Sequence, residues 1–296
     1  MNIYISNNTG VPIVKNVTKY FEMTYNNLID LLLHDISKSC IITDDDNKSN
    51  IYIYGIQTTS KTIIDNSKIN ILLCVENCSI GRSHYKHYNE YKHFNDNRID
   101  IYIYNDISTI IKTDQYLAIP FIYLYIDQFI RIEKTLSIKE TCFNNKKFCL
   151  FTSRNLLNDN KKNILQLLHT IDNIDHISQY NISNVSCYHS KEILEVFNKY
   201  KFIICFENSK SDGYITEKIF NVFLSKSIPI YDGAPNINNY INKNSYISYD
   251  DTKIIDKIKL LSSNEKLYNT YINSNKISHL YNNESWTKLL EDYIYN

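Results

Sequence analysis

Most of the turn-forming residues of this chain gather in one short stretch. The 296 residues include only five Gly and four Pro, yet Gly213, Pro229, Gly233 and Pro235 all fall between positions 202 and 240. Glycine and proline permit tight turns, and glycine lets the backbone approach another group closely. We therefore expect a ligand to bind at residues 202–240, named here the turn-rich segment.

The turn-rich segment has the hydrophobic pattern of a strand, a helix and a second strand. Phe202–Phe206 is a short apolar run typical of a buried strand, and Ser227–Tyr231 is another. Between them, apolar residues recur at helical spacing at positions 215, 219, 220, 223 and 224. The pattern predicts a βαβ unit, which is the building block of parallel α/β sheets.

Glu217 and Lys218 fall in the first turn of this predicted helix. The unpaired N–H groups and the positive dipole end of a helix N-terminus favour an anion, and a lysine there adds a mobile cation. A lysine at this end opposes the helix dipole by up to about 1 kcal/mol, so helix stability does not account for it. The sequence favours a phosphate site and leaves open that Lys218 is a solvated first-turn side chain.

The motif FENS, a short spacer and GYITEKIFNVFLSKSIPIYDGAP together resemble the donor-site motif of the inverting α1,3/4-fucosyltransferases. Members of that family carry FEN, a short loop, Y-[VI]-T-E-K and a strand of the IPI-Y-x-G-x-P type. The resemblance implies an α/β chain with the GT-B fold, in which two Rossmann-like domains face a central cleft. It also implies GDP-fucose as the donor substrate.

In that family the counterparts of Asn208, Tyr214, Glu217 and Lys218 hold the donor. The resemblance implies that Glu217 engages the fucose ring and that Lys218 engages the diphosphate. From the residues alone, Asn208 can instead be a turn-forming residue. In the strand alternation, Glu207 points to the opposite side from Phe206 and Asn208. We therefore expect Glu207 to hold the loop that follows the strand rather than the substrate.

A weaker resemblance extends toward the N-terminus. The family's strand ending in G-E-N-E-S is similar to NILLCVENC (70–78), and two later family segments resemble IDIYIYND (99–106) and YLAIPFIYLYI (116–126). Glu76 then matches the carboxylate taken as the general base, which removes the proton from the acceptor hydroxyl. Without the resemblance, Glu76 can be an edge carboxylate that caps the next turn.

The chain departs from the family where an arginine contacts the diphosphate. The nearest counterpart of that region is FTSRNLLNDNKKNILQLL (151–168). Counting forward from Ser153 puts Lys161 or Lys162 at the arginine's place, with Arg154 as the second choice. A lysine lacks the planar fork that grips two phosphate oxygens together, but its charge still neutralises the leaving group.

Two groups of metal-ligand residue types do not predict a metal site. Residues 84–93 carry His at 84, 87 and 93 and Glu at 90, but steps of three spread around a helix and do not converge on one ion. This segment is longer than in the family, so we expect it to reshape the acceptor site. Asp44 and Asp46 form a D-x-D motif of the kind that can bind a metal ion, but the polar run around them is more typical of a loop before a strand. We expect no metal and no cofactor besides the donor substrate.

Composition limits the partners and the location. The 32 basic and 32 acidic residues give no surplus of positive charge for nucleic acid. The longest apolar run, 116–126, is too short for the roughly 20 residues of a membrane span, and the N-terminus has no signal-peptide pattern. Seven cysteines without zinc-type pairs fit reduced thiols. We therefore expect a cytoplasmic protein, soluble or peripheral to a membrane.

The length predicts two domains. We expect an acceptor-binding Rossmann-like domain at 1–135, a linker at 136–147 and a donor-binding domain at 148–296, whose last helix packs back across the first domain in many GT-B proteins. The expected strands are Asn2–Ile5, Ile51–Tyr54, Ile71–Val75, Asp100–Tyr104 and Phe148–Thr152, besides those of the turn-rich segment. The expected helices are Asn26–His34, Lys162–Thr170, Ser190–Lys199 and a terminal group within Asn264–Tyr295.

The resemblance thus predicts an inverting transfer of L-fucose from GDP-fucose to a hydroxyl of an oligosaccharide or glycoconjugate acceptor. The expected acceptor atom is O3 or O4 of GlcNAc or a related sugar. Two alternatives stay open. A catalytically silent glycan- or nucleotide-binding module would keep the turn-rich segment but would not need Glu76. A GT-B transferase for another nucleotide sugar would use the same scaffold.

Overall fold

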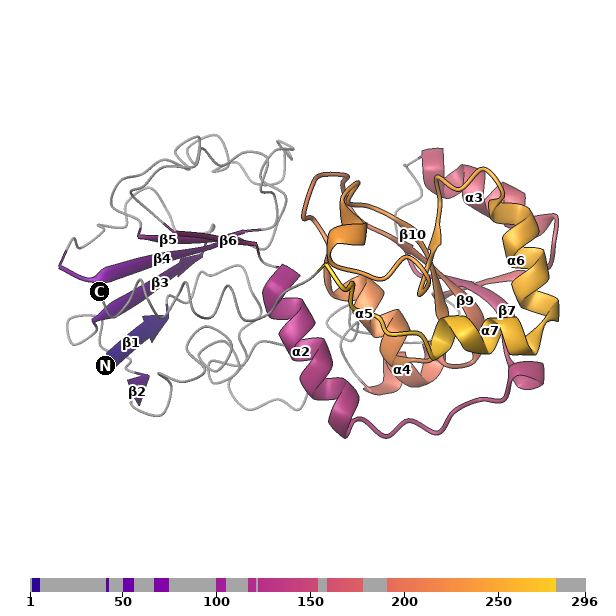
Figure 1. The fold of residues 1–296 in the computed structure, drawn as a ribbon, viewed down its shortest axis with the longest axis horizontal. Coiled ribbons are helices and arrows are strands. Elements are labelled where there is room, and N and C mark those ends of the chain that lie inside the picture. The colour runs from indigo at the N-terminus through magenta and orange to yellow at the C-terminus, as the bar shows by residue number, and fades with distance from the viewer. Residues whose placement is uncertain are drawn as a thin grey trace.

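The chain forms two parallel β-sheets. The structure is a computed structural model, and it describes residues 2–5, 41–42, 50–55, 67–74, 100–104, 117–120, 122–153, 159–177 and 191–280. One sheet has six strands in the order β2-β1-β3-β4-β5-β6, and the other has five in the order β11-β10-β9-β7-β8. The two sheets lie on opposite sides of helix α2 (Figure 1). This arrangement is the expected α/β class.

The elements of the first sheet are β1 (Asn2–Ile5), β2 (Ile41–Ile42), β3 (Ile51–Gly55), β4 (Ile69–Cys74), β5 (Ile101–Tyr104) and β6 (Leu117–Pro120). The second sheet consists of β7 (Lys147–Phe151), β8 (Ile174–His176), β9 (Tyr200–Phe206), β10 (Ile228–Asp232) and β11 (Ile247–Ser248). The helices are α2 (Ile122–Thr135), α3 (Asp159–His169), α4 (Lys191–Phe197), α5 (Glu217–Leu224), α6 (Ile254–Ser263) and α7 (Glu265–Ile272).

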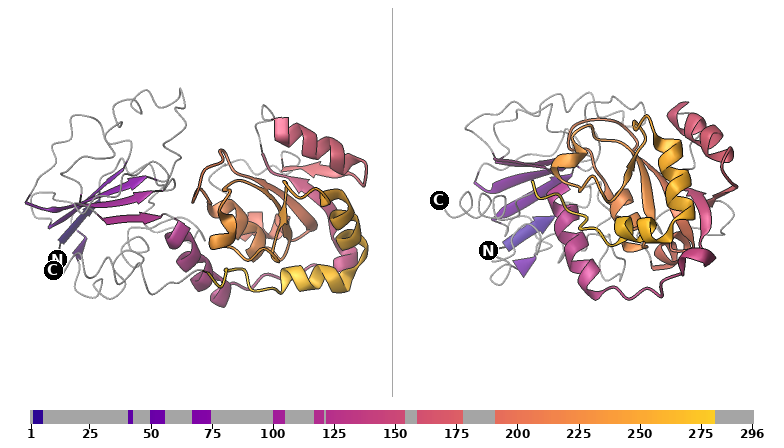
Figure 2. Two further views of the ribbon diagram at one scale, coloured as in Figure 1. Left: turned by 45° about the horizontal axis from the view of Figure 1, so that its top comes forward. Right: turned by 45° about the vertical axis from the view of Figure 1, so that its right-hand side comes forward.

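Helices cover both faces of the second sheet (Figure 2). One buried cluster joins the sheet to α2, α4 and α5, and the other joins it to α3, α6 and α7. Side chains of β9 alternate between the clusters, with Ile203 and Cys205 in the first and Phe202, Ile204 and Phe206 in the second. A strand buried on both faces needs apolar residues at every position, which explains the continuous run FIICF.

The apolar run 116–126 divides into a strand and a helix. Proline cannot donate a ladder hydrogen bond, and β6 ends at Pro120 before α2 begins at Ile122. Ile122, Ile126 and Phe129 are buried on one side of α2, where the ring centroid of Phe129 lies 5.4 Å from that of Phe220 on α5. No helix in the described part of the chain is long and apolar enough to cross a membrane.

Most predicted elements that fall within the described residues are confirmed to within a few positions. The βαβ unit of the turn-rich segment is β9, α5 and β10, and the predicted strands correspond to β1, β3, β4, β5 and β7. The expected helix Asn26–His34 and the chain beyond residue 280 lie outside the described residues. Strands β2, β6, β8 and β11 and helices α2 and α6 were not predicted. The domain boundaries at 135 and 148 stay a prediction.

Lys276 is a buried lysine that is expected to make the folding stability depend on pH. Its ammonium donates to the carbonyl oxygens of Tyr271 at 2.7 Å and Ile272 at 2.9 Å, at the end of α7. Burial, and then the charge of Lys226, lowers the pKa of Lys276 to about 8. In the unfolded chain a lysine titrates near a pKa of about 10.4, so between these pH values the unfolded chain binds more protons. Stability therefore rises as the pH increases above about 8.

We expect the free energy of unfolding of the wild type, relative to Lys276→Met, to rise by on the order of 3 kcal/mol between about pH 7 and pH 10. Urea unfolding of both proteins at several pH values measures this difference, in which the titration of all other groups cancels. Parallel pH profiles for the two proteins would contradict the buried, charged state of Lys276.

Candidate active site

A buried carboxylate organises the start of α5. Glu207 follows β9 directly, and its side chain is 0% exposed. It accepts hydrogen bonds from the backbone N–H of Thr216 at 2.8 Å, from the Thr216 hydroxyl at 2.9 Å and from Nζ of Lys218 at 2.8 Å. These bonds tie the two ends of the loop 207–216 together. The expectation that Glu207 holds this loop is confirmed.

Lys218 is a fixed cation in the first turn of α5. Its ammonium donates to Glu207 and, at 2.9 Å, to the hydroxyl of Thr216. Burial by itself would lower the pKa of Lys218, but the carboxylates of Glu207 and Glu217 outweigh burial and raise it. The ammonium is therefore charged at neutral pH. Its side chain is 27% exposed, and its third N–H meets no further acceptor among the described residues.

The N-terminus of α5 has no side-chain cap. Thr216 occupies the N-cap position, yet its side chain makes no cap hydrogen bond because its hydroxyl is turned toward Glu207. The N–H groups of the first turn are thus not satisfied in the usual way by the N-cap side chain. Together with the charge of Lys218, this geometry suits an anionic group at the start of the helix.

Tyr125 contacts the site from α2 and was not identified from the sequence. Its hydroxyl donates to Glu217 at 3.3 Å, and its ring stacks on Phe220 with centroids 6.2 Å apart. Burial, and then the charge of Glu217, raises the pKa of Tyr125 well above its ordinary value, so the phenol stays protonated. The two residues are 92 positions apart in the sequence. A pattern within one segment gives no signal for such a contact.

The other residues predicted for donor binding lie on the loop before α5. Gly213 has a φ of 81°, a conformation that glycine adopts without strain, and its N–H donates to Asn236 at 2.8 Å. This turn places Tyr214 in the interior, where it is 2% exposed. Asn208 is exposed at the start of the loop. The structure therefore gathers Asn208, Tyr214, Glu217 and Lys218 on one loop and the helix start that follows it.

Gly233 lies where a side chain has no room. A Cβ atom there would overlap the hydroxyl of Tyr231 and approach Cγ of Glu207 to 2.7 Å. The Tyr231 hydroxyl is held in place because it accepts from the N–H of Ala234 at 3.1 Å.

We expect Gly233→Ala to destabilise the protein by about 1–3 kcal/mol, seen as a lower melting temperature. Asn244→Ala, at an exposed neighbouring turn, should melt like the wild type, and equal stability of both variants would contradict this close packing.

Two adjacent lysines in the first turn of α3 have different surroundings. Lys161 is 6% exposed, and its Nζ donates to the hydroxyl of Ser153 at 2.9 Å, just after β7. Lys162 faces solvent and pairs with Asp159 at 3.6 Å. Only Lys161 is therefore directed toward the carboxyl ends of the strands.

Several predicted positions lie outside the described residues. These are Glu76, Arg154, Asp44, Asp46 and the segment 84–93. The strand before Glu76 is described, and β4 pairs with β3 on one side and β5 on the other, so Glu76 follows an inner strand of the first sheet. Within the described ranges, no three His, Cys, Asp or Glu side chains lie close enough to hold a metal ion.

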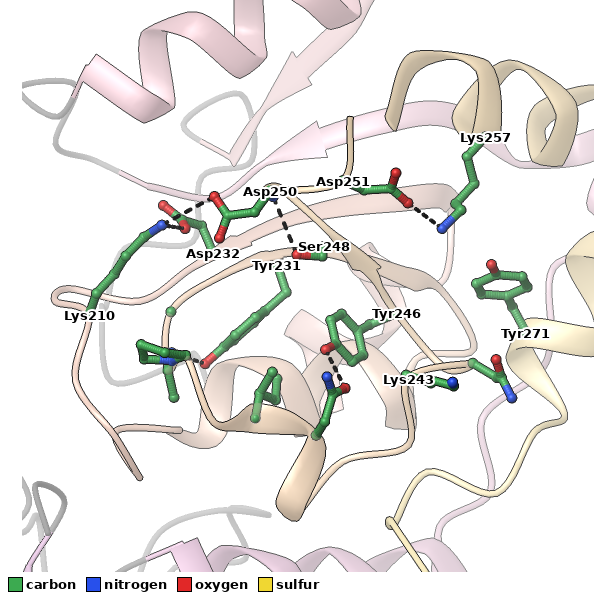
Figure 3. Close-up of a pocket in the computed structure, with 16 residues that line it drawn as sticks. Lys210, Tyr231, Asp232, Lys243, Tyr246, Ser248, Asp250, Asp251, Lys257 and Tyr271 are labelled. Carbon is green, nitrogen blue, oxygen red and sulfur yellow. Dashed lines mark hydrogen bonds and ion pairs between the residues drawn. The ribbon is translucent and has the colours of Figure 1, made fainter. Parts of the chain in front are cut away.

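A pocket of about 370 Å³ lies beside the loop 207–216, against β10 and β11. Its lining contains positively and negatively charged side chains (Figure 3). Lys210 pairs with Asp232 and Asp250 at one end, and Lys257 pairs with Asp251 at the other. None of the predicted donor-binding residues that the structure describes lines this pocket. The pocket and the start of α5 are therefore neighbouring but separate features.

Parts of the chain are similar in sequence to known fucosyltransferases. The chain resembles the α-(1,3)-fucosyltransferase FucT of Helicobacter pylori, with 34% identity over 119 residues that cover 37% of this chain and 25% of that protein. It resembles the 4-galactosyl-N-acetylglucosaminide 3-α-L-fucosyltransferase 9 of Mus musculus, with 36% identity over 92 residues that cover 29% of this chain and 26% of that protein. The matches thus span about a quarter of the length of these relatives.

The fold is shared over nearly the whole chain. Crystal structures of an α1,3-fucosyltransferase, alone and with GDP-fucose, superpose with TM-scores of 0.67 and 0.62 at 18% identity. Each alignment covers 99% of this chain and 88% of the other. The predicted GT-B fold class is confirmed. The model of the family described as "Glycosyltransferase family 10 (fucosyltransferase) C-term" matches residues 143–292. The chain therefore belongs to glycosyltransferase family 10, the α1,3/4-fucosyltransferases.

Proposed function

We propose that the protein transfers L-fucose from GDP-fucose to a hydroxyl of a glycan acceptor, with inversion at the anomeric carbon. The observation that carries this proposal is the charged Lys218, held by buried Glu207 at an N-terminus of α5 that lacks a side-chain cap. This arrangement offers N–H donors and a positive charge to one diphosphate. We propose O3 or O4 of GlcNAc or a related sugar as the acceptor atom.

Each proposed residue has a separate task in an in-line displacement. Glu76 removes the proton from the acceptor hydroxyl, whose oxygen attacks the anomeric carbon as the bond to the diphosphate breaks. Lys218, together with Lys161 or Arg154, stabilises the negative charge on departing GDP. Glu217 binds the fucose ring. Asn208 and Tyr214 complete the donor site from the loop before α5.

Donor identity is tested by thermal shift, because a ligand that binds only the folded state raises its stability. We expect GDP-fucose and GDP to raise the melting temperature more than GDP-mannose or UDP-GlcNAc at equal concentration. A glycan-acceptor screen with GDP-fucose, in EDTA and with added manganese, then measures transfer. Preference for another nucleotide sugar would overturn the proposed donor, and donor binding without transfer to any acceptor would support a silent binding module.

The two lysines of α3 provide a matched pair of variants. We expect Lys161→Ala to weaken GDP binding about tenfold or more, because a hydrogen bond to a charged group contributes about 1.5–3 kcal/mol. Lys162→Ala removes the same charge from a solvent-facing position and should leave the affinity unchanged. Titration calorimetry of both variants measures this difference. Equal losses would mean that only the summed charge matters, and a loss in Lys162→Ala alone would reverse the assignment.

A further inference from the structure

Asp232 is a buried carboxylate that contacts two elements of the proposed donor site. It ends β10, and its side chain is 5% exposed. One carboxylate oxygen accepts from the side-chain amide of Asn160 at 3.0 Å, and the other forms an ion pair with the ammonium of Lys210. Its backbone carbonyl accepts from the N–H of Glu207 at 2.8 Å. Figure 3 shows Asp232 and Lys210 where they line the pocket.

The two partners of Asp232 sit next to residues with proposed roles. Asn160 immediately precedes Lys161 in the first turn of α3. Lys210 lies two positions after Asn208 in the loop 207–216. A single carboxylate at the carboxyl end of the sheet therefore joins the first turn of α3 to the loop that leads into α5.

We propose that Asp232 is a positioning residue that fixes the first turn of α3 relative to the loop 207–216. This inference rests on the proposed function, in which Lys161 and Asn208 bind one donor molecule. Asp232 thereby holds these two residues at the separation that one diphosphate requires. Small displacements of groups that hold a reacting substrate are costly, so the separation of the two elements affects binding.

Asp232→Asn tests this role with almost no change in shape. The amide carries no charge for the ion pair with Lys210. With its one oxygen toward Lys210, it presents N–H groups to the N–H groups of Asn160, so that contact survives only if the Asn160 amide turns over. Asp251→Asn is the matched control. Asp251 lines the same pocket, and its side chain accepts from the N–H of Lys253 at 2.9 Å and pairs with Lys257 at 2.5 Å, both at the start of α6. Lys210→Met is a second variant at a position that is 41% exposed, and it should fold even if Asp232→Asn does not.

Hydrogen exchange tests the connection without any ligand. We expect Asp232→Asn to speed exchange in peptides covering 159–168 and in peptides covering 207–216, and Lys210→Met to speed it in the second group alone. Asp251→Asn should exchange like the wild type in both. Exchange that stays unchanged in both segments of a folded Asp232→Asn protein, or in the loop of Lys210→Met, would overturn the proposal.

GDP affinity tests what the connection does for the site. We expect the Kd for GDP to rise about tenfold in Asp232→Asn, which corresponds to about 1.4 kcal/mol, and to stay unchanged in Asp251→Asn. Tighter GDP binding in Asp232→Asn would show that Asp232 withholds Lys210 from the phosphates, and unchanged affinity would show a structural role only. Either result overturns the proposal. A wild type that does not bind GDP would refute the proposed function, while hydrogen exchange would still decide whether Asp232 joins the two elements.

Discussion

Lys218→Ala is expected to lower the affinity for GDP by about a hundredfold or more and to destabilise the folded protein by about 3–5 kcal/mol. Binding falls because the variant removes the cation at the start of α5. Stability falls because Glu207, whose side chain is 0% exposed, is left as a buried charge without its ion-pair partner. Titration calorimetry and urea unfolding measure the two effects separately.

A double variant separates binding from stability. Lys218→Met combined with Glu207→Gln removes both charges, so we expect much of the lost stability to return while GDP binding does not. Lys257→Ala is the control for loss of a partly exposed lysine, since its partner Asp251 is also partly exposed, and it should cost no more than about 1 kcal/mol. Recovery of GDP binding in the double variant would mean that Lys218 acts on folding alone.

Glu76→Gln is expected to slow fucosyl transfer by about a hundredfold to ten-thousandfold, which is the usual contribution of a general base. The amide has the shape of the carboxylate but does not take the proton from the acceptor hydroxyl. We expect the affinity for GDP-fucose to stay unchanged, because Glu76 follows the first sheet and the proposed donor residues belong to the second. Initial rates with a saturating donor, together with calorimetry, measure both quantities.

An exposed glutamate on α7 provides the control for this substitution. Glu265→Gln should transfer fucose at the wild-type rate. Unchanged turnover in Glu76→Gln would discard Glu76 as the base. A parallel loss of donor binding would instead place Glu76 in the donor site, and it would leave the identity of the base to be found on another element.

The sequence predicts best where several local signals coincide. Glycines, prolines and two apolar runs within the turn-rich segment were sufficient to place β9, α5 and β10 within a few residues, and Lys218 in the first turn of α5. The alternation along β9 also predicted that Glu207 faces the loop. These features depend on neighbouring residues, which a sequence displays directly.

Contacts between distant segments were not predictable in the same way. Tyr125 meets Glu217 across 92 positions, and Asp232 meets Asn160 across 72. No periodicity within a segment encodes such pairs, because they depend on how the helices pack on the sheet. The different surroundings of Lys161 and Lys162 likewise depend on the start of α3 at Asp159, which sets the face of the helix that each residue occupies.

A crystal structure of the protein with GDP would show directly where the diphosphate binds. We predict the β-phosphate within hydrogen-bond distance of Nζ of Lys218 and of first-turn N–H groups of α5, with Nζ still bonded to Glu207. Density for the diphosphate at another place, or a Lys218 side chain turned away into solvent, would show that the start of α5 does not hold the leaving group.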